Sequence, residues 1–193
     1  MRARLFAPCL LLGLVGCPQG GSAPAPTPKG PAPDAPAQDA AQDPRRARAQ
    51  ETAQALGKAL KAELMAALQE GGPAAGIAAC KQVAPAVPDQ VAPEGVRVGR
   101  TSFKLRNPQN AAPAWAAADV AAQVAEPRFS VAPEGTFRAL LPIRLEATCT
   151  LCHGPQDELS SEVQAALAQD YPDDQATGFA DGDLRGYVWV EVE

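Results

Sequence analysis

The stretch LRGYVWVEV, residues 184–192, decides the fold class. Along it, valines alternate with aromatic and acidic residues, and alternate side chains of an extended chain point to opposite faces. The pattern therefore predicts a strand with one face made of valines. That face carries Val188, Val190 and Val192, and the opposite face carries Tyr187, Trp189 and Glu191.

Upstream of this strand, the expected helices come mostly before the expected strands. Leucines recur every four residues from Leu56 to Leu68, which predicts an amphipathic helix that ends at Gly71-Gly72-Pro73. Further helices are expected at residues 74–84, 113–125 and 160–169, and strands at residues 96–98 and 136–145. Because helices and strands do not alternate as βαβ units, we expect an α+β fold with an antiparallel sheet.

Length and charge exclude some classes of protein. The chain has 193 residues, which fits one domain with extra segments rather than two full domains. It has 17 basic and 22 acidic residues, for a formal net charge of −5. This balance argues against a phosphate-binding surface, so we expect no nucleic acid partner.

Residues 1–16 are typical of a signal peptide, because Arg2 and Arg4 precede a short apolar run. A transmembrane helix needs about 20 apolar residues, more than this run offers. The run ends in Leu14-Val15-Gly16-Cys17, which resembles a bacterial lipobox. We therefore expect lipidation of Cys17 and an exported lipoprotein on the periplasmic face of a bacterial membrane, with membrane lipid as a partner. The alternative is a plain signal peptide that leaves Cys17 free.

Residues 17–44 form an expected tether behind the lipidated cysteine. The segment after Cys17 is rich in Pro and Ala and has no Leu, Ile, Val, Phe, Trp or Tyr. It cannot bury enough apolar surface to offset the entropy lost on ordering. We therefore expect residues 45–193 to hold the single folded domain.

Residues 149–153, CTLCH, match the attachment motif of c-type haem. In that chemistry two thiols three residues apart bond to the porphyrin vinyl groups, and the adjacent imidazole binds the iron. We therefore expect one covalent haem c on Cys149 and Cys152, with His153 as the proximal iron ligand. A redox CxxC pair, a zinc site that includes Cys80, and a simple disulfide are the alternatives.

The second iron ligand has few candidates, because His153 is the only His in the chain. Cys80 lies on the apolar face of the helix expected at residues 74–84 and has no thiol partner by count. A free Cys is often a small buried hydrophobe. An unpaired Cys in an exported protein also fits an iron thiolate, so Cys80 is the expected distal ligand. An open sixth position or Met65 is the alternative, although Met65 lies on the leucine face, where core packing is expected.

Four blocks of sequence resemble a family of extracytoplasmic single-haem c-type domains, long catalogued as a domain of unknown function. They are GIAACKQVAP (76–85), VGRTSFKLRNPQN (98–110), LPIRLEATCTLCHG (141–154) and YPDDQATGFADGDLRG (171–186). The resemblance implies a PAS-like antiparallel sheet with N-terminal and flanking helices around one haem. It also implies Cys80 as the distal ligand and His153 as the proximal one. The family often has an acidic residue directly after the Trp that corresponds to Trp115, whereas this chain has Ala116.

The second block contains a concentration of basic residues, among which Arg100 and Arg106 are candidate partners of the two haem propionates. The alternative is that these cations pair with the acidic C-terminal segment.

The ligand set favours a redox function over catalysis. Imidazole and thiolate together fill the iron's coordination positions, and no second His is available as a general acid, so we expect no enzyme activity. Two functions remain: redox or gas sensing and signalling, or electron transfer by a cytochrome c tethered near a membrane redox complex. Each requires a separate redox or signalling protein partner. A lipoprotein with a structural haem is the third alternative.

Overall fold

This computed structural model describes residue 40 and residues 42–193, all of which belong to one compact unit, Pro33–Glu193. The expected signal peptide, Cys17 and the tether up to residue 39 lie outside the described residues. In chain order the elements are α2 (Arg45–Gln82), η1 (Ala84–Ala86), α3 (Val87–Val91), β1 (Val96–Thr101), η2 (Pro108–Asn110), α4 (Ala117–Ala121), β2 (Arg128–Val131), β3 (Phe137–Arg144), η3 (Ala147–Cys149), α5 (Thr150–His153), α6 (Ser161–Asp170) and β4 (Leu184–Val192).

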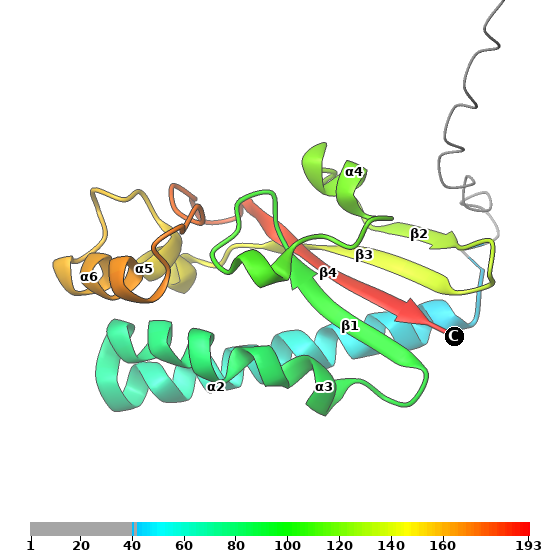
Figure 1. The fold of residues 1–193 in the computed structure, drawn as a ribbon, viewed down its shortest axis with the longest axis horizontal. Helices are drawn as coiled ribbons and strands as arrows, with labels where there is room; N and C mark the ends of the chain where they lie inside the picture. The colour runs from blue at the N-terminus through cyan, green and yellow to red at the C-terminus, as the bar shows by residue number, and fades with distance from the viewer. Residues whose placement is uncertain (1–39, 41) are drawn as a thin grey trace, which may run out of the picture. The chain divides into compact units, whose positions relative to one another are not determined.

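The four strands form one antiparallel sheet in the order β1-β4-β3-β2 (Figure 1). β4 lies between β1 and β3 and has the bounds that its alternating sequence predicts. The α+β fold class with an antiparallel sheet is therefore confirmed.

One face of the sheet packs against α2, which runs along it (Figure 1). The β4 valines, fully or almost fully buried, form a single core cluster with Phe137 of β3 and Leu56 of α2. Burying side chains of this size from water contributes roughly 1.5–3 kcal/mol each. The valine face expected from the sequence is thus the face that holds the helix to the sheet.

The opposite face of β4 is also covered. Tyr187 is fully buried against Leu140 of β3 and Val120 of α4. Glu191 is 7% exposed, and its Oε1 accepts a hydrogen bond from Trp115 Nε1 at 2.9 Å. The segment between β1 and β2 therefore folds over the second face and supplies the buried carboxylate with a donor.

The long helix α2 is two helical segments joined at the predicted stop. Gly71 and Gly72 leave helical geometry, and Gly72 has φ 69° and ψ −165°, a conformation that is essentially restricted to glycine. The second segment turns back beside the first, since a Cβ on Gly76 would contact Leu64 and Leu68. It also packs against α6. This return brings the second segment to the end of the sheet where α5 and α6 lie (Figure 1).

Several elements differ from the sequence-based expectation. The helix expected at 113–125 shrinks to α4, which has no side-chain cap and is followed by Gln123 at φ 53°. The strand expected at 96–98 extends to Thr101 because it pairs with β4 as far as Tyr187. β2 was not expected, because four residues at a sheet edge give too short an alternation.

Met65 also departs from its expected place. Core packing was expected from its position on the leucine face, but the side chain is 37% exposed. Beyond Leu56, the leucines of this helix are only half-buried, so the apolar stripe is wider than the surface that covers it. No helix within the described residues is both long and apolar enough to cross a membrane.

The kink gives a first prediction. Gly72→Ala should lower the free energy of unfolding by roughly 1–3 kcal/mol, because an L side chain is strained at this φ and ψ. Gly57→Ala is the matched control: Gly57 lies within α2, and an added Cβ would meet nothing within 4 Å. It should raise stability by roughly 0.5–1 kcal/mol. Urea unfolding of both variants measures this, and equal effects would contradict the assigned geometry.

Candidate functional site

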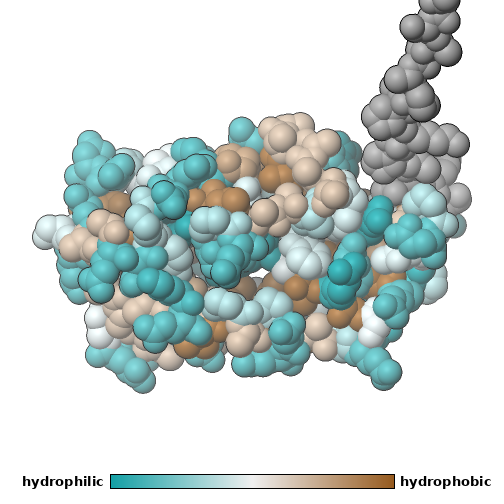
Figure 2. Space-filling view, in the orientation of Figure 1, coloured by the Kyte–Doolittle hydropathy of each residue, from teal (hydrophilic) through white to brown (hydrophobic). Residues whose placement is uncertain are grey.

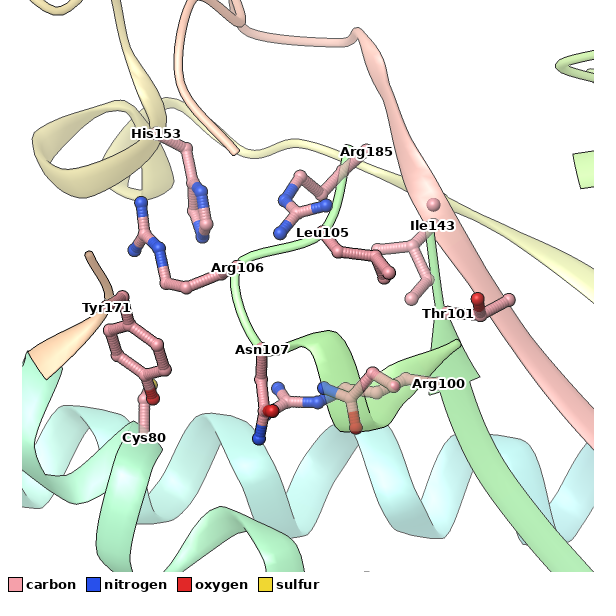
Figure 3. A pocket seen from close by; sticks show the side chains of 12 residues that line it. Cys80, Arg100, Thr101, Leu105, Arg106, Asn107, Ile143, His153, Tyr171 and Arg185 are labelled. Carbon is pink, nitrogen blue, oxygen red and sulfur yellow. The ribbon is translucent and has the colours of Figure 1, made fainter. Parts of the chain in front are cut away.

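A cavity of about 170 Å³ opens where α5, the end of β1 and the second segment of α2 converge (Figure 3). Figure 2 shows a gap in the molecular surface between α2 and the loop after β1. The lining residues are Cys80, Arg100, Thr101, Leu105, Arg106, Asn107, Asn110, Ile143, His153, Tyr171, Arg185 and Gly186.

The cavity brings together four of the residues singled out from the sequence: Cys80, Arg100, Arg106 and His153. They come from three sequence blocks that are distant along the chain. Met65, the alternative sulfur ligand, is not among the lining residues. The structure therefore places Cys80 and His153 at one site, and their roles as iron ligands remain predictions.

The two thiols of the CTLCH motif lie on the turn that presents His153. Cys149 ends η3 and Cys152 lies in α5, and neither borders the cavity directly. Both are free thiols and both are half-buried, as is Cys80. Burial raises the pKa of Cys152, and the nearby Arg106 partly offsets this effect.

Gly154 ends the motif helix in an extended conformation that leaves no room for a side chain, since a Cβ would lie 2.6 Å from the Thr150 carbonyl oxygen. The chain then pairs with a segment further along. Phe179 N donates to the His153 carbonyl at 2.9 Å, and Gly178 N donates to the Gly154 carbonyl at 2.8 Å. These bonds dock the block at 171–186 against the CTLCH turn.

His153 is held in one tautomer. Its Nδ1 is 2.7 Å from the carbonyl oxygen of Ala176, so Nδ1 carries the proton and donates it to that carbonyl. Nε2 is left to face the cavity, into which Figure 3 shows the imidazole directed. Burial lowers the pKa of His153 to about 2, and the positive charges of Arg106, Arg185 and Arg100 lower it further. The imidazole is therefore neutral, the form that binds a metal.

Arg106 is already engaged with the protein. Its Nη2 lies 3.0 Å from Asp174 Oδ2, and the two side chains are only 10% and 8% exposed. The same nitrogen donates to the carbonyl oxygens of Cys152 at 2.5 Å and of Ala176 at 3.4 Å. Pairing with the acidic C-terminal segment, one of the two alternatives for this cation, is what the structure shows for Arg106.

Arg100 and Arg185 face the same cavity without such a partner. Within the described part of the chain, neither has a carboxylate at ion-pair distance. Arg185 Nη1 donates instead to Ser102 Oγ at 2.8 Å and to the Lys104 carbonyl at 3.1 Å. Burial lowers the pKa of Arg185 to about 10, and repulsion from Arg106 and Arg100 adds to the effect. The cavity thus has an excess of positive charge.

Three lining residues were missed by sequence reasoning. Arg185 is the one cation between residues 154 and 193, a signal that could have been used. Tyr171 is 7% exposed, and its pKa is raised to about 12 by burial and by the neighbouring Cys80. Thr101 has a buried hydroxyl with no hydrogen-bond partner. The latter two lie inside the blocks at 98–110 and 171–186 but belong to no motif with a chemical requirement of its own, and only tertiary packing places them at the cavity.

The zinc alternative gains no support from the described residues. Among them, no three or more His, Cys, Asp or Glu side chains lie close enough together to hold a metal ion. The disulfide alternative gains no support either, because Cys149 and Cys152 are both free thiols in this structure.

Comparison with known proteins agrees with the resemblance seen in the sequence. The model of the Tll0287-like family matches residues 37–192. The crystal structure of the cyanobacterial heme-protein Tll0287 is similar, with 24% sequence identity and a TM-score of 0.52. The match covers 78% of this chain and 96% of that one. No curated protein matches. The chain belongs to the Tll0287-like family, and the expected resemblance to a haem-domain family is confirmed.

The buried imidazole gives a second prediction. Its folded-state pKa lies below the unfolded value of about 6.5, so the unfolded chain binds more protons as the pH falls below that value. The contribution of His153 to stability is therefore complete above about pH 6.5 and is lost as the pH falls towards 2.

Urea unfolding of the full chain made without haem, at pH 7 and at pH 5, measures the effect. We expect stability to fall more steeply with acid in the wild type than in His153→Gln, by up to about 1.4 kcal/mol per pH unit. Identical slopes would show that the imidazole titrates normally in the fold.

Proposed function

We propose that this member of the Tll0287-like family is a redox protein that carries one covalent haem c in the cavity described above. The observation that carries the proposal is the neutral imidazole of His153, held by Ala176 so that Nε2 faces a cavity lined by three arginines and Cys80. The structurally similar Tll0287 is itself a heme-protein.

The residues present fit such a group. Cys149 and Cys152 offer two free thiols on the turn that ends in His153. Cys80 borders the same cavity and offers a second axial ligand from a different element. When bound, haem supplies one-electron chemistry between ferric and ferrous iron.

The excess of positive charge in the cavity supports an anionic ligand. Haem has two propionate carboxylates, and arginine binds carboxylates through charge-assisted, often bidentate hydrogen bonds. Arg100 and Arg185 lack carboxylate partners within the described residues, whereas Arg106 is paired with Asp174. We therefore assign the propionates to Arg100 and Arg185. Arg106, already paired with Asp174, would contribute only its positive charge near them.

We further propose that the protein senses redox state or a diatomic gas through Cys80, rather than acting as an enzyme. Cys80 lies on the segment beyond the kink at Gly71 and Gly72, which separates it from the core part of α2. Loss of the thiolate from the iron would release this segment from the cavity, a local change that a two-state element can transmit.

Electron transfer is the second candidate. Leu151, inside the CTLCH turn, is 51% exposed, and Cys149 beside it is only half-buried. A redox partner could therefore approach the attachment turn from solvent. In either case we propose an exported lipoprotein, anchored through Cys17 at the periplasmic face of a bacterial membrane, that acts on a separate redox or signalling protein.

Covalent attachment gives a third prediction. The full chain, produced in a host that matures c-type cytochromes, should keep a haem stain after denaturation. Cys149→Ala and Cys152→Ala should each weaken the stain, and the double variant should abolish it, because each thioether holds one vinyl group. Cys80→Ala is the matched control and should retain the stain. An unstained wild type would overturn the assignment of haem c.

Axial ligation gives a fourth prediction. The ferric absorption spectrum of the wild type should be that of a thiolate-bound low-spin haem, and Cys80→Ala should lose these features. Met65→Leu should leave the spectrum unchanged, because Met65 does not border the cavity. Loss of the thiolate features on reduction of the wild type would favour the sensor. Retention, with rapid electron exchange to a soluble cytochrome, would favour the carrier.

A further inference from the structure

We propose that the buried Arg106–Asp174 ion pair is a positioning unit for His153 and sets the reduction potential of the haem through the backbone that His153 contacts. The inference rests on the proposed function, because it concerns the ligand that the haem iron would use. Neither residue need touch the iron or the porphyrin.

The pair holds the backbone on both sides of the imidazole. Arg106 Nη2 donates to the carbonyl of Cys152, one residue before His153, at 2.5 Å. Asp174 Oδ1 accepts a hydrogen bond from Ala176 N at 2.8 Å, which holds the residue whose carbonyl receives the His153 proton. One ion pair thus links the turn that carries the imidazole to its hydrogen-bond acceptor.

Arg106 and His153 also share that acceptor. The Ala176 carbonyl lies 2.7 Å from His153 Nδ1 and 3.4 Å from Arg106 Nη2. A hydrogen bond from Nδ1–H makes an imidazole a stronger electron donor to its metal. A second donor on the same oxygen weakens this effect. Figure 3 shows the Arg106 side chain beside the imidazole.

Burial makes the charges of the pair effective at the ligand. Both side chains are about nine-tenths buried, so water screens them little. The guanidinium favours the reduced, less positive iron, whereas the carboxylate favours the oxidised iron. With both present, the two effects largely cancel. Removing one charge at a time should therefore move the potential in opposite directions.

The test is a spectroelectrochemical titration of the full haem-loaded chain. Asp174→Asn keeps the shape of the side chain and leaves Arg106 uncompensated, so the midpoint potential should rise. Arg106→Gln leaves the carboxylate uncompensated, so the potential should fall. Arg106→Lys retains the charge and should lie closer to the wild type. The double variant Arg106→Gln/Asp174→Asn should return most of the way to it.

A matched ion pair of the same residue types provides the control. Arg45 Nη2 lies 2.7 Å from Asp43 Oδ2, at the end of α2 away from α5 and α6 (Figure 1). Asp43→Asn and Arg45→Gln should leave the potential unchanged.

The outcomes separate this inference from the proposed function. Wild-type chain without covalent haem would overturn the proposed function itself. Haem-loaded variants whose potentials shift in the same direction, or no more than the Asp43 and Arg45 controls, would overturn only the role of the pair. So would loss of the folded circular dichroism spectrum in both Asp174→Asn and Arg106→Lys, because the pair would then be merely structural.

Discussion

The hydrogen bond from His153 Nδ1 to the carbonyl of Ala176 is the contact on which the rest of the site depends. It fixes the tautomer and aims Nε2 into the cavity, while burial and the nearby guanidinium groups keep the ring neutral. A backbone carbonyl can do this only if its own position is fixed. Here two backbone hydrogen bonds, from Gly178 and Phe179, hold this segment to the end of the CTLCH turn. The Asp174 carboxylate also accepts a hydrogen bond from Ala176 N, which fixes the carbonyl further. The sequence block that follows α6 therefore acts as a frame for the motif.

The charge of the cavity sets the second constraint. Within the described residues, three guanidinium groups border a space whose lining includes no carboxylate, and only Arg106 is paired with one, that of Asp174. Concentrating like charges away from water is unfavourable unless an anion joins them. The lowered pKa of Arg185 expresses the same cost. In a ligand with two carboxylates and a metal, the carboxylates would pair with the arginines and the metal would bind the neutral imidazole of His153. A purely apolar ligand would do neither.

What the sequence could predict follows from the range of the interactions involved. The CTLCH spacing is a local chemical requirement, and the alternation in β4 is a local periodicity, so both were visible. Gly71-Gly72 marked the kink correctly for the same reason. Arg185 and the Ala176 carbonyl act across the fold. The position of Arg185 at the cavity depends on how β4 pairs with its neighbours. The Ala176 acceptor is a backbone carbonyl, which every residue has, so the sequence does not mark it. The burial of Met65 was mispredicted because helical periodicity identifies a face but not how much of that face is covered.

The fold and the site are coupled through α2. Its first segment is held to the sheet by the valines of β4, and its second segment, after the kink, presents Cys80 to the cavity and packs on α6. Ile77, one turn before Cys80, is almost fully buried with Tyr171, Val163 and Leu167. Cys80 therefore sits on a segment anchored by a small cluster of its own rather than by the main core. The same cluster packs against Cys152 of the CTLCH turn, so the segment that carries Cys80 and the turn that carries His153 are held together beside the cavity.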